Sequence, residues 1–387
     1  MAADLDAIGV GPIVVGVIDH ATRQPQNPLF DGRKRGEIGV GTERSDRVVE
    51  KGGHGVEVSG AADAMFLVPE RCSAVGNEWR PGGQADETAR MRLGIFLAPV
   101  TVSSYVQECQ AVADAGFTSV WSPQIFGLET LAAIAVAGTT VKNITFGTAV
   151  VPTYPRHPMT MAQLALTAQD ATGGRLVLGI GLSHQVVIEG MYGMSFDKPA
   201  IHMREYLSIL GPLVRDRQVS FIGSALTFKG AVQAPGVAPF PILIAALAPA
   251  MLRLAGTLAD GTILWMTGPR TIGDHIIPSM HSAATEAGRP TPQTIVGLPV
   301  CLTNDVDAAK AKAAKDFAIY GQLPSYRAVL DREGAAGPAD IAIVGDEAAI
   351  AAHIQRVADS GATELCANIF GTTEEKARTQ QFLATLL

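Results

Sequence analysis

The sequence lacks most of the features that mark secreted, membrane-bound or nucleic-acid-binding proteins. It has only four cysteines, none in a C-x-x-C pair, so we expect neither structural disulfides nor a zinc site, and a cytoplasmic location. Charged residues make up only 17% of the chain and the net charge is −7, which argues against nucleic-acid or anionic-membrane partners. Apolar runs are interrupted by proline before they reach the roughly 20 residues of a membrane span. No charged segment followed by an apolar core indicates a signal peptide.

Apolar material, by contrast, is plentiful. Of the 387 residues, 47% are hydrophobic, enough for one large core or two smaller domains.

The character of the chain changes at Met91. Residues 1–90 are rich in glycine and charge and show no helical or strand period, so we expect a disordered or loosely attached extension. Met91 is followed at once by a buried-strand pattern, which suggests the hypothesis that it is the natural start.

From Met91 onward, eight apolar strand patterns alternate with helical ones. The predicted strands cover residues 92–97, 118–122, 144–151, 175–181, 241–246, 261–266, 294–303 and 363–370. Eight such repeats in about 300 residues predict an α/β fold, a (β/α)8 TIM barrel, with a doubly wound open sheet as the alternative. Two insertions follow strands 4 and 7. Residues 185–240 are predicted to hold a helix and a hairpin, and residues 320–345 a loop; insertions of this kind often form substrate lids.

Polar residues collect just after the ends of these strands, most clearly between Ile144 and His184. Parallel α/β folds bind their ligands at that edge. The sequence therefore predicts an enzyme with its active site at the C-terminal mouth of the barrel. No metal ligands are predicted.

Four segments carry a family resemblance: FGTAVVPTYPRHP, GGRLVLGIGLSH, AALAPAMLRLAGTLADGTILW and LPSYRAVLDREG with ADIAIVGD. In this order and spacing, the chain from Met91 to its C-terminus resembles the luciferase-like monooxygenase superfamily, and within it the coenzyme F420-dependent oxidoreductases. The resemblance implies a barrel with the deazaflavin or flavin ring across its mouth. It also implies a non-prolyl cis peptide at Ala149-Val150 that pushes against the ring.

The resemblance assigns cofactor contacts to strand ends. The ring is expected against apolar walls, and the tail near the N-terminal ends of helices. The implied cofactor-binding residues are Gln124, Ala149, Val150, Thr153, Gly181, Leu182, Ser183, His184, Ala246, Leu247 and Ala248, with Phe96 and Ile180 as further walls. Ala149 and the glycines are also compatible with ordinary strand packing. Gly179-x-Gly181 is not a dinucleotide fingerprint, because His184 stands where the third glycine belongs.

Two residues are candidates for proton transfer, His157 and Tyr154. His157 is equally well explained as a loop histidine bonded to backbone beside Pro158. Arg156 either reaches the acidic tail of the cofactor or is solvated. Glu189, Tyr192 and Asp197 are expected to position a helix rather than perform chemistry.

The sequence departs from its apparent relatives at two positions. Ser122, Pro123 and Gln124 stand where relatives carry an acid pair, so a proton-transfer mechanism does not carry over directly. His184 stands near the catalytic glutamate of sugar-phosphate dehydrogenases, so we do not expect that substrate.

The leading functional hypothesis is hydride transfer between reduced F420 and a small organic substrate, an activated alkene, an imine or an alcohol/carbonyl pair. An FMN-dependent monooxygenase is the alternative, because fold alone does not separate the two. A non-catalytic cofactor-binding protein is the third hypothesis. By resemblance we expect a homodimer, with ETLAAIAVAG (129–138) as either its surface or a helix packed on the barrel.

Overall fold

The computed structural model describes residues 90–387. The predicted N-terminal extension and the hypothesis about Met91 as the start therefore concern residues outside the described range. So does Cys72, whereas Cys109, Cys301 and Cys366 are buried free thiols.

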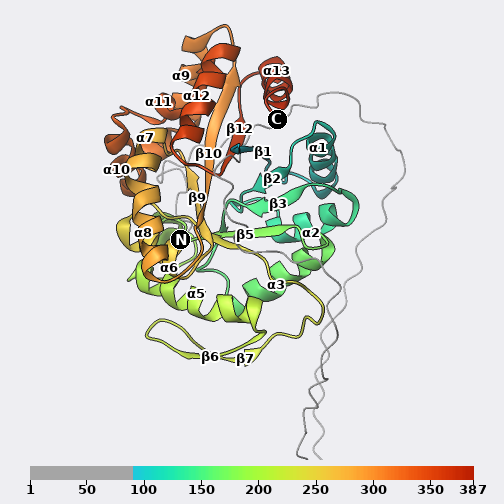
Figure 1. Cartoon of the computed structure of the whole chain (residues 1–387), viewed down its shortest axis with the longest axis vertical. Helices are drawn as coiled ribbons and strands as arrows, with labels where there is room; N and C mark the ends of the chain where they lie inside the picture. The colour runs from blue at the N-terminus through green and yellow to red at the C-terminus, as the bar shows by residue number, and fades with distance from the viewer. Residues whose placement is uncertain (1–89) are drawn as a thin grey trace, which may run out of the picture. The chain divides into compact units, whose positions relative to one another are not determined.

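Eight parallel strand positions close into a barrel, which confirms the predicted (β/α)8 fold over the open sheet (Figure 1). Each strand pairs with the next in chain order, and β12 pairs back with β1. The third position is split into two short strands, β3 and β4. The barrel strands are β1 (Arg92–Phe96), β2 (Ser119–Ser122), β3 (Thr145–Thr148) with β4 (Val151–Pro152), β5 (Leu176–Gly181), β8 (Ile242–Ile244), β9 (Gly261–Trp265), β10 (Gln293–Leu302) and β12 (Glu364–Ile369).

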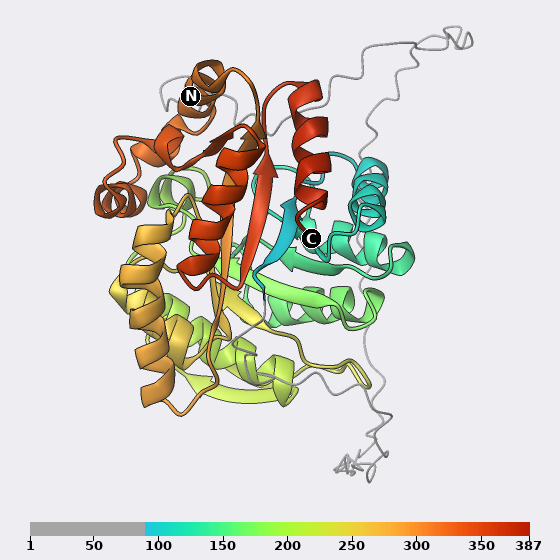
Figure 2. The same ribbon diagram turned by 45° about the horizontal axis from the view of Figure 1, so that its top comes forward.

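Helices surround this barrel, as the turned view shows (Figure 2). Helix α3 illustrates how the sequence sets their bounds: Pro158 occupies its first turn, where a missing N–H costs nothing, and Gly173 and Gly174 follow its end with positive φ. The outer helices are α1 (Val102–Asp114), α2 (Thr130–Thr140), α3 (Pro158–Ala171), α6 (Pro249–Thr257), α7 (Pro269–Thr271) continuing through the π-helical η2 (Ile272–Ile276) into α8 (Ile277–Glu286), α9 (Val306–Asp316), α12 (Glu347–Asp359) and α13 (Thr373–Ala384).

The insertion after β5 has the predicted helix and hairpin. It contains α4 (Gln185–Gly190), α5 (Pro199–Arg215) and the antiparallel strands β6 (Gln218–Ile222) and β7 (Thr227–Ala231). Glu205 on α5 fixes the hairpin, because its carboxylate accepts hydrogen bonds from the backbone N–H groups of Ser224, Ala225 and Leu226. The insertion is thus an ordered part of the domain.

The prediction of a loop over residues 320–345 was wrong. This stretch completes the 3₁₀ turn η3 (Ala318–Gly321) and then forms α10 (Pro324–Glu333), α11 (Pro338–Ile341) and β11 (Ile343–Gly345), which pairs with β10. The local signals were present: Pro324 begins α10, and Gly334 ends it with a φ of 80°. These are the usual start and stop residues of a helix.

Large apolar side chains fill the barrel interior. Trp121, Leu243, Ile263, Ile295 and Cys366 form the packed centre, and Phe96, Ala149, Val150 and Val177 pack against it. The predicted ETLAAIAVAG segment forms α2 and buries most of its apolar residues, while Val136 is exposed. Within residues 90–387, no helix combines the length and apolar character needed to cross a membrane.

Candidate active site

The break between β3 and β4 shapes one side of the barrel mouth. The peptide bond between Ala149 and Val150 is cis, as the resemblance implies. Thr148 compensates for the lost pairing, since its hydroxyl donates to the carbonyl of Gly179 (2.7 Å) and accepts from the N–H of that residue (2.8 Å). Pairing then resumes at Val151 with Ile180 and continues at Pro152 with Gly181. Ala149 and Val150 are therefore half-buried and unpaired with β5, while β3 before them and β4 after them both pair with it.

Aromatic rings at the ends of β1 and β9 form a second side of the mouth. Phe96 at the end of β1 stacks on Trp265 at the end of β9, with ring centroids 5.6 Å apart. Trp265 also meets Tyr320 edge-on at 5.8 Å, and Tyr320 meets Tyr326 of α10 at 5.0 Å. The sequence analysis missed Trp265, Tyr320 and Tyr326, although the tryptophan at the end of a predicted strand was a usable signal.

The turn after β5 has a constrained backbone. Ser183 has a φ of 62°, in the left-handed region that favours glycine, and so does Met266 after β9, with a φ of 53°. Non-glycine residues held in this region gather at functional sites. His184 is half-buried, burial lowers its pKa, and its ring lies 6.0 Å from that of Tyr326. The imidazole of His184 is therefore favoured in its neutral form beside this turn.

The segment after β8 leads into the N-terminus of α6. Ala246 is buried, Leu247 is half-buried, and Ala248 is the exposed N-cap residue without a side-chain cap. The first N–H groups of a helix are free to bind an anion when no side chain caps them. This geometry is compatible with the phosphate contact that the resemblance implies.

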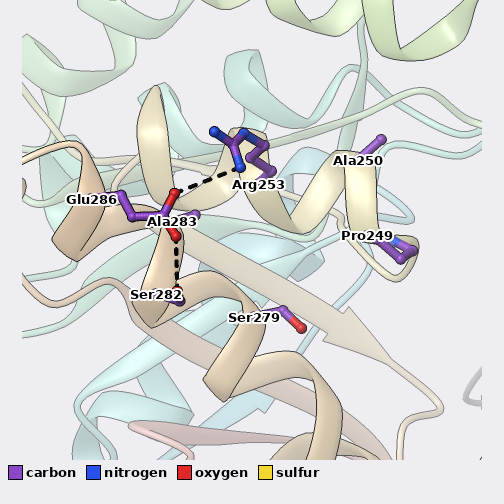
Figure 3. A pocket seen from close by; sticks show the side chains of 7 residues that line it. All are labelled: Pro249, Ala250, Arg253, Ser279, Ser282, Ala283 and Glu286. Atoms are coloured by element: carbon purple, nitrogen blue, oxygen red, sulfur yellow. Dashed lines mark hydrogen bonds and ion pairs between the residues drawn. The ribbon is translucent and has the colours of Figure 1, made fainter.

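A hollow of about 390 Å³ lies on the surface between α6 and α8 (Figure 3). Its charged residues neutralise each other, because Arg253 lies 3.7 Å from Glu286, which also accepts a hydrogen bond from Ser282. The two charged side chains that line the hollow are thus paired with each other. The hollow is lined by Pro249, Ala250, Arg253, Ser279, Ser282, Ala283 and Glu286.

Tyr154 lies at the rim, directly after β4 and Thr153. Its hydroxyl is buried and has no hydrogen-bond partner within residues 90–387. Its ring stacks on His202 of α5 at 4.0 Å and on Phe196 at 5.3 Å. Burial raises the pKa of Tyr154, and the carboxylates of Asp197 and, to a lesser degree, Glu189 raise it further. The phenol is therefore protonated at neutral pH.

The neighbouring Arg156 and His157 are engaged in local structure. Nδ1 of His157 accepts a hydrogen bond from the N–H of Met159 (3.1 Å), so this exposed histidine caps α3. Arg156 lies 3.5 Å from Glu129. The contact of His157 matches the alternative of a histidine bonded to backbone, whereas Arg156 is only 16% exposed and ion-paired, so it is not the solvated residue of the alternative.

Gln124 and Glu189 also hold backbone in place. Oε1 of Gln124 accepts a hydrogen bond from the N–H of Thr130 (2.6 Å) at the start of α2. Glu189 accepts from the side chain of Gln185 (2.9 Å) and from the N–H of Phe196 (3.4 Å). Within the described part of the chain, no cluster of three or more His, Cys, Asp or Glu residues is arranged to hold a metal ion.

This fold is that of a known family. The chain belongs to the luciferase-like monooxygenases, whose sequence profile matches residues 87–364. It is 28% identical over 221 residues to a 5,10-methylenetetrahydromethanopterin reductase of Methanolobus tindarius, covering 57% of this chain and 67% of the reductase. It is 30% identical over 202 residues to a putative coenzyme F420-dependent oxidoreductase of Mycobacterium tuberculosis, covering 48% of this chain and 58% of that protein.

A solved structure shares the fold. The coenzyme F420-dependent tetrahydromethanopterin reductase of Methanopyrus kandleri superposes with a TM-score of 0.65 at 20% identity, over 76% of this chain and 98% of the reductase. The chain is thus an oxidoreductase-family protein with a luciferase-like barrel.

Proposed function

We propose that this protein is an F420-dependent oxidoreductase that transfers hydride between reduced deazaflavin and a small organic substrate. The substrate class would be an activated alkene, an imine or an alcohol/carbonyl pair. The observation that carries the proposal is the half-buried apolar mouth between Ala149–Val150 and the Phe96–Trp265 stack. The family and the F420-dependent relatives support it.

The residues of the mouth fit such a cofactor. A flat, apolar ring system matches the small side chain of Ala149 and the aromatic rings opposite, which exclude water on binding. An anionic tail matches the uncapped N-terminus of α6 at Ala248 and the turn at Ser183. When bound, the deazaflavin supplies the two-electron hydride chemistry.

The chain itself must supply position and a proton. His157 and Tyr154 are the two candidates, and their contacts separate them. Nδ1 of His157 already accepts a backbone hydrogen bond, whereas the hydroxyl of Tyr154 has no partner among the described residues. We therefore favour Tyr154 as the group that donates a proton to the substrate.

The alternative is an FMN-dependent monooxygenase. The family description favours it, since the profile that matches residues 87–364 is that of luciferase-like monooxygenases. A cofactor titration separates the two functions, because the choice between deazaflavin and flavin decides which chemistry follows.

The test is a titration of the purified full-length protein with F420 and FMN side by side, followed by tryptophan fluorescence, to which Trp265 in the mouth contributes. We expect tight F420 and weak FMN binding.

The substitution Ala149→Leu should weaken F420 binding about tenfold, equivalent to about 1.4 kcal/mol, because the larger side chain occupies the apolar space expected to hold the ring. Ala231→Leu, at an exposed position on β7, is the matched control. A preference for FMN would favour the monooxygenase, and binding of neither would contradict both.

A further inference from the structure

The hydroxyl of Tyr154 is one of two buried polar groups at the mouth that have no hydrogen-bond partner among residues 90–387, the other being Nε1 of Trp265. Native proteins pair almost all buried polar atoms, so a buried hydroxyl without a partner calls for an explanation. Tyr154 follows β4 at the mouth edge of the barrel, so its unpartnered hydroxyl is a candidate to bond to a substrate there. The question is what keeps the phenol in this place, because a tyrosine side chain left free would turn toward water.

His202 is the group that holds it. The imidazole lies parallel to the phenol, with an interplanar angle of 3° and ring centroids 4.0 Å apart. Its Nε2 is paired with the hydroxyl of Thr153 at 3.1 Å, and Thr153 is fixed in turn by its N–H, which donates to the carbonyl of Gly181. The imidazole is thus tied to the residue that precedes Tyr154, although it comes from α5, 49 residues further along the chain.

We propose that His202 is a positioning residue, whose imidazole stacks on the phenol of Tyr154 and holds its hydroxyl in place for a substrate at the mouth. This inference rests on the proposed function and names the proton-donating unit of the same site. On this proposal, the insertion after β5 contributes to catalysis through His202, which positions Tyr154.

The surrounding charges agree with this arrangement. The carboxylates of Asp197 and Glu189 face the phenol and oppose its ionisation. Burial lowers the pKa of His202, while the nearby carboxylate of Glu205 on α5 acts in the opposite direction. A neutral imidazole adds no positive charge that would stabilise a phenolate. The phenol therefore keeps its proton until a stronger base forms beside it.

The proton balance is simple. When bound, reduced deazaflavin would supply a hydride, which is two electrons and one hydrogen, to a carbon of the substrate. The O–H bond of Tyr154 breaks, and its proton goes to the neighbouring atom, which has gained the electron pair of the double bond. Solvent water returns a proton to the phenolate before the next turnover. The net change is addition of two hydrogens across the double bond and oxidation of the deazaflavin.

The first test needs no cofactor. Near-ultraviolet absorbance of the full-length protein is titrated with base, and subtracting the curve of Tyr154→Phe isolates the ionisation of Tyr154. His202→Ala, which admits water to the stack, should lower the pKa of Tyr154 by about one unit or more. His202→Phe keeps an aromatic ring and should leave it close to that of the wild type. Identical curves for the wild type and His202→Ala would overturn the proposal.

The second test uses turnover with F420 and an enone. Tyr154→Phe should lower kcat about 10²-fold or more, the usual contribution of a proton donor, with F420 affinity changed less than about threefold. His202→Ala should lower kcat with little change in KM, and His202→Phe should recover part of the loss. His281→Ala, on the outer helix α8, is the matched control and should match the wild type.

The outcomes separate the two proposals. If the wild type turns over and His202→Ala keeps its full kcat, the positioning role is wrong while the proposed function stands. If Tyr154→Phe keeps its full kcat, the donor role is wrong in the same way. If the wild type binds and reduces nothing, the proposed function fails, and the tyrosine titration still decides whether His202 controls Tyr154.

Discussion

At the scale of single residues, Glu205 ties helix α5 to the β6–β7 hairpin within the insertion after β5. Burial alone would raise the pKa of this carboxyl, but hydrogen bonds from the N–H groups of Ser224, Ala225 and Leu226 and from the Ser224 hydroxyl outweigh it and lower the pKa to about 2. We predict that Glu205→Gln lowers the free energy of unfolding by about 2 kcal/mol at pH 7, since bonds to a charged acceptor are lost. Urea denaturation at pH 7 measures this.

The same residue predicts a pH dependence with a definite sign. Because the folded-state pKa of Glu205, about 2, lies below its ordinary value of 4.5, its contribution is fully present above pH 4.5 and is lost as the pH falls toward 2. The stability difference between wild type and Glu205→Gln should therefore shrink over that range. The exposed Glu374→Gln should show little difference at any pH. A gap that stays constant down to the acid limit would contradict the assignment.

Residue-level prediction from the sequence could point to side chains that directly follow a strand, but not to a contact made from a distant part of the chain. Thr153, Tyr154 and Ser183 stand directly after strands, where the strand-end rule and the family resemblance together pointed to them, and their roles stay predictions. His202 comes from a helix in an insertion, and no sequence period connects it to Tyr154. Only the fold brings these two rings together.

At the scale of elements, the contact between α6 and α8 depends on Gly256. A Cβ at this position would lie 2.9 Å from the backbone N of Ala284 and closer still to the carbonyl of Met280. We predict that Gly256→Ala forces the two helices apart, costs about 1–3 kcal/mol of stability and weakens F420 binding, because α6 also presents Ala248. Thermal unfolding and the cofactor titration measure the two effects.

A matched substitution separates packing from helix propensity. Gly190→Ala, at the end of α4, meets no atom within 4 Å and should be neutral or slightly stabilising, since alanine favours helix by up to about 1 kcal/mol over glycine. If Gly256→Ala behaves like Gly190→Ala, then α6 and α8 are not in close contact and the expected effect on F420 binding loses its basis.

Element prediction worked best for buried strands, because sequences apolar on both faces have few alternatives in a barrel. All eight predicted strands are present. The stretch 320–345 was assigned wrongly because its helix α10 is polar and partly exposed, which weakens the 3.6-residue apolar period. Its start and stop residues, Pro324 and Gly334, carried the signal that periodicity did not. Local capping signals deserve more weight in such insertions.

At the scale of the whole molecule, the sequence predicted the barrel strands but not the side-chain contacts that join the last strand to the first two. Glu364 on the last strand, β12, is buried and accepts hydrogen bonds from Ser119 and from Nε1 of Trp121, both on β2. It also pairs with Arg92 of β1 at 2.9 Å. One carboxylate thus ties the last strand to the first two. No sequence pattern marks it, because its partners lie more than 240 residues away.

This arrangement predicts that substitutions of Glu364 lower the free energy of unfolding of the barrel. Removing one member of a buried charged network typically costs 3–5 kcal/mol, because the remaining polar groups lose their partner. We predict a loss of about 3 kcal/mol for Glu364→Ala, discounted because Arg92 is half exposed and can be solvated. Glu364→Gln should lose less, since an amide oxygen still accepts from Trp121. Fluorescence-detected unfolding in urea measures both, with Glu374→Gln as the exposed control. If both variants match the control, β1–β12 pairing closes the barrel without help from this carboxylate, and its burial must be explained otherwise.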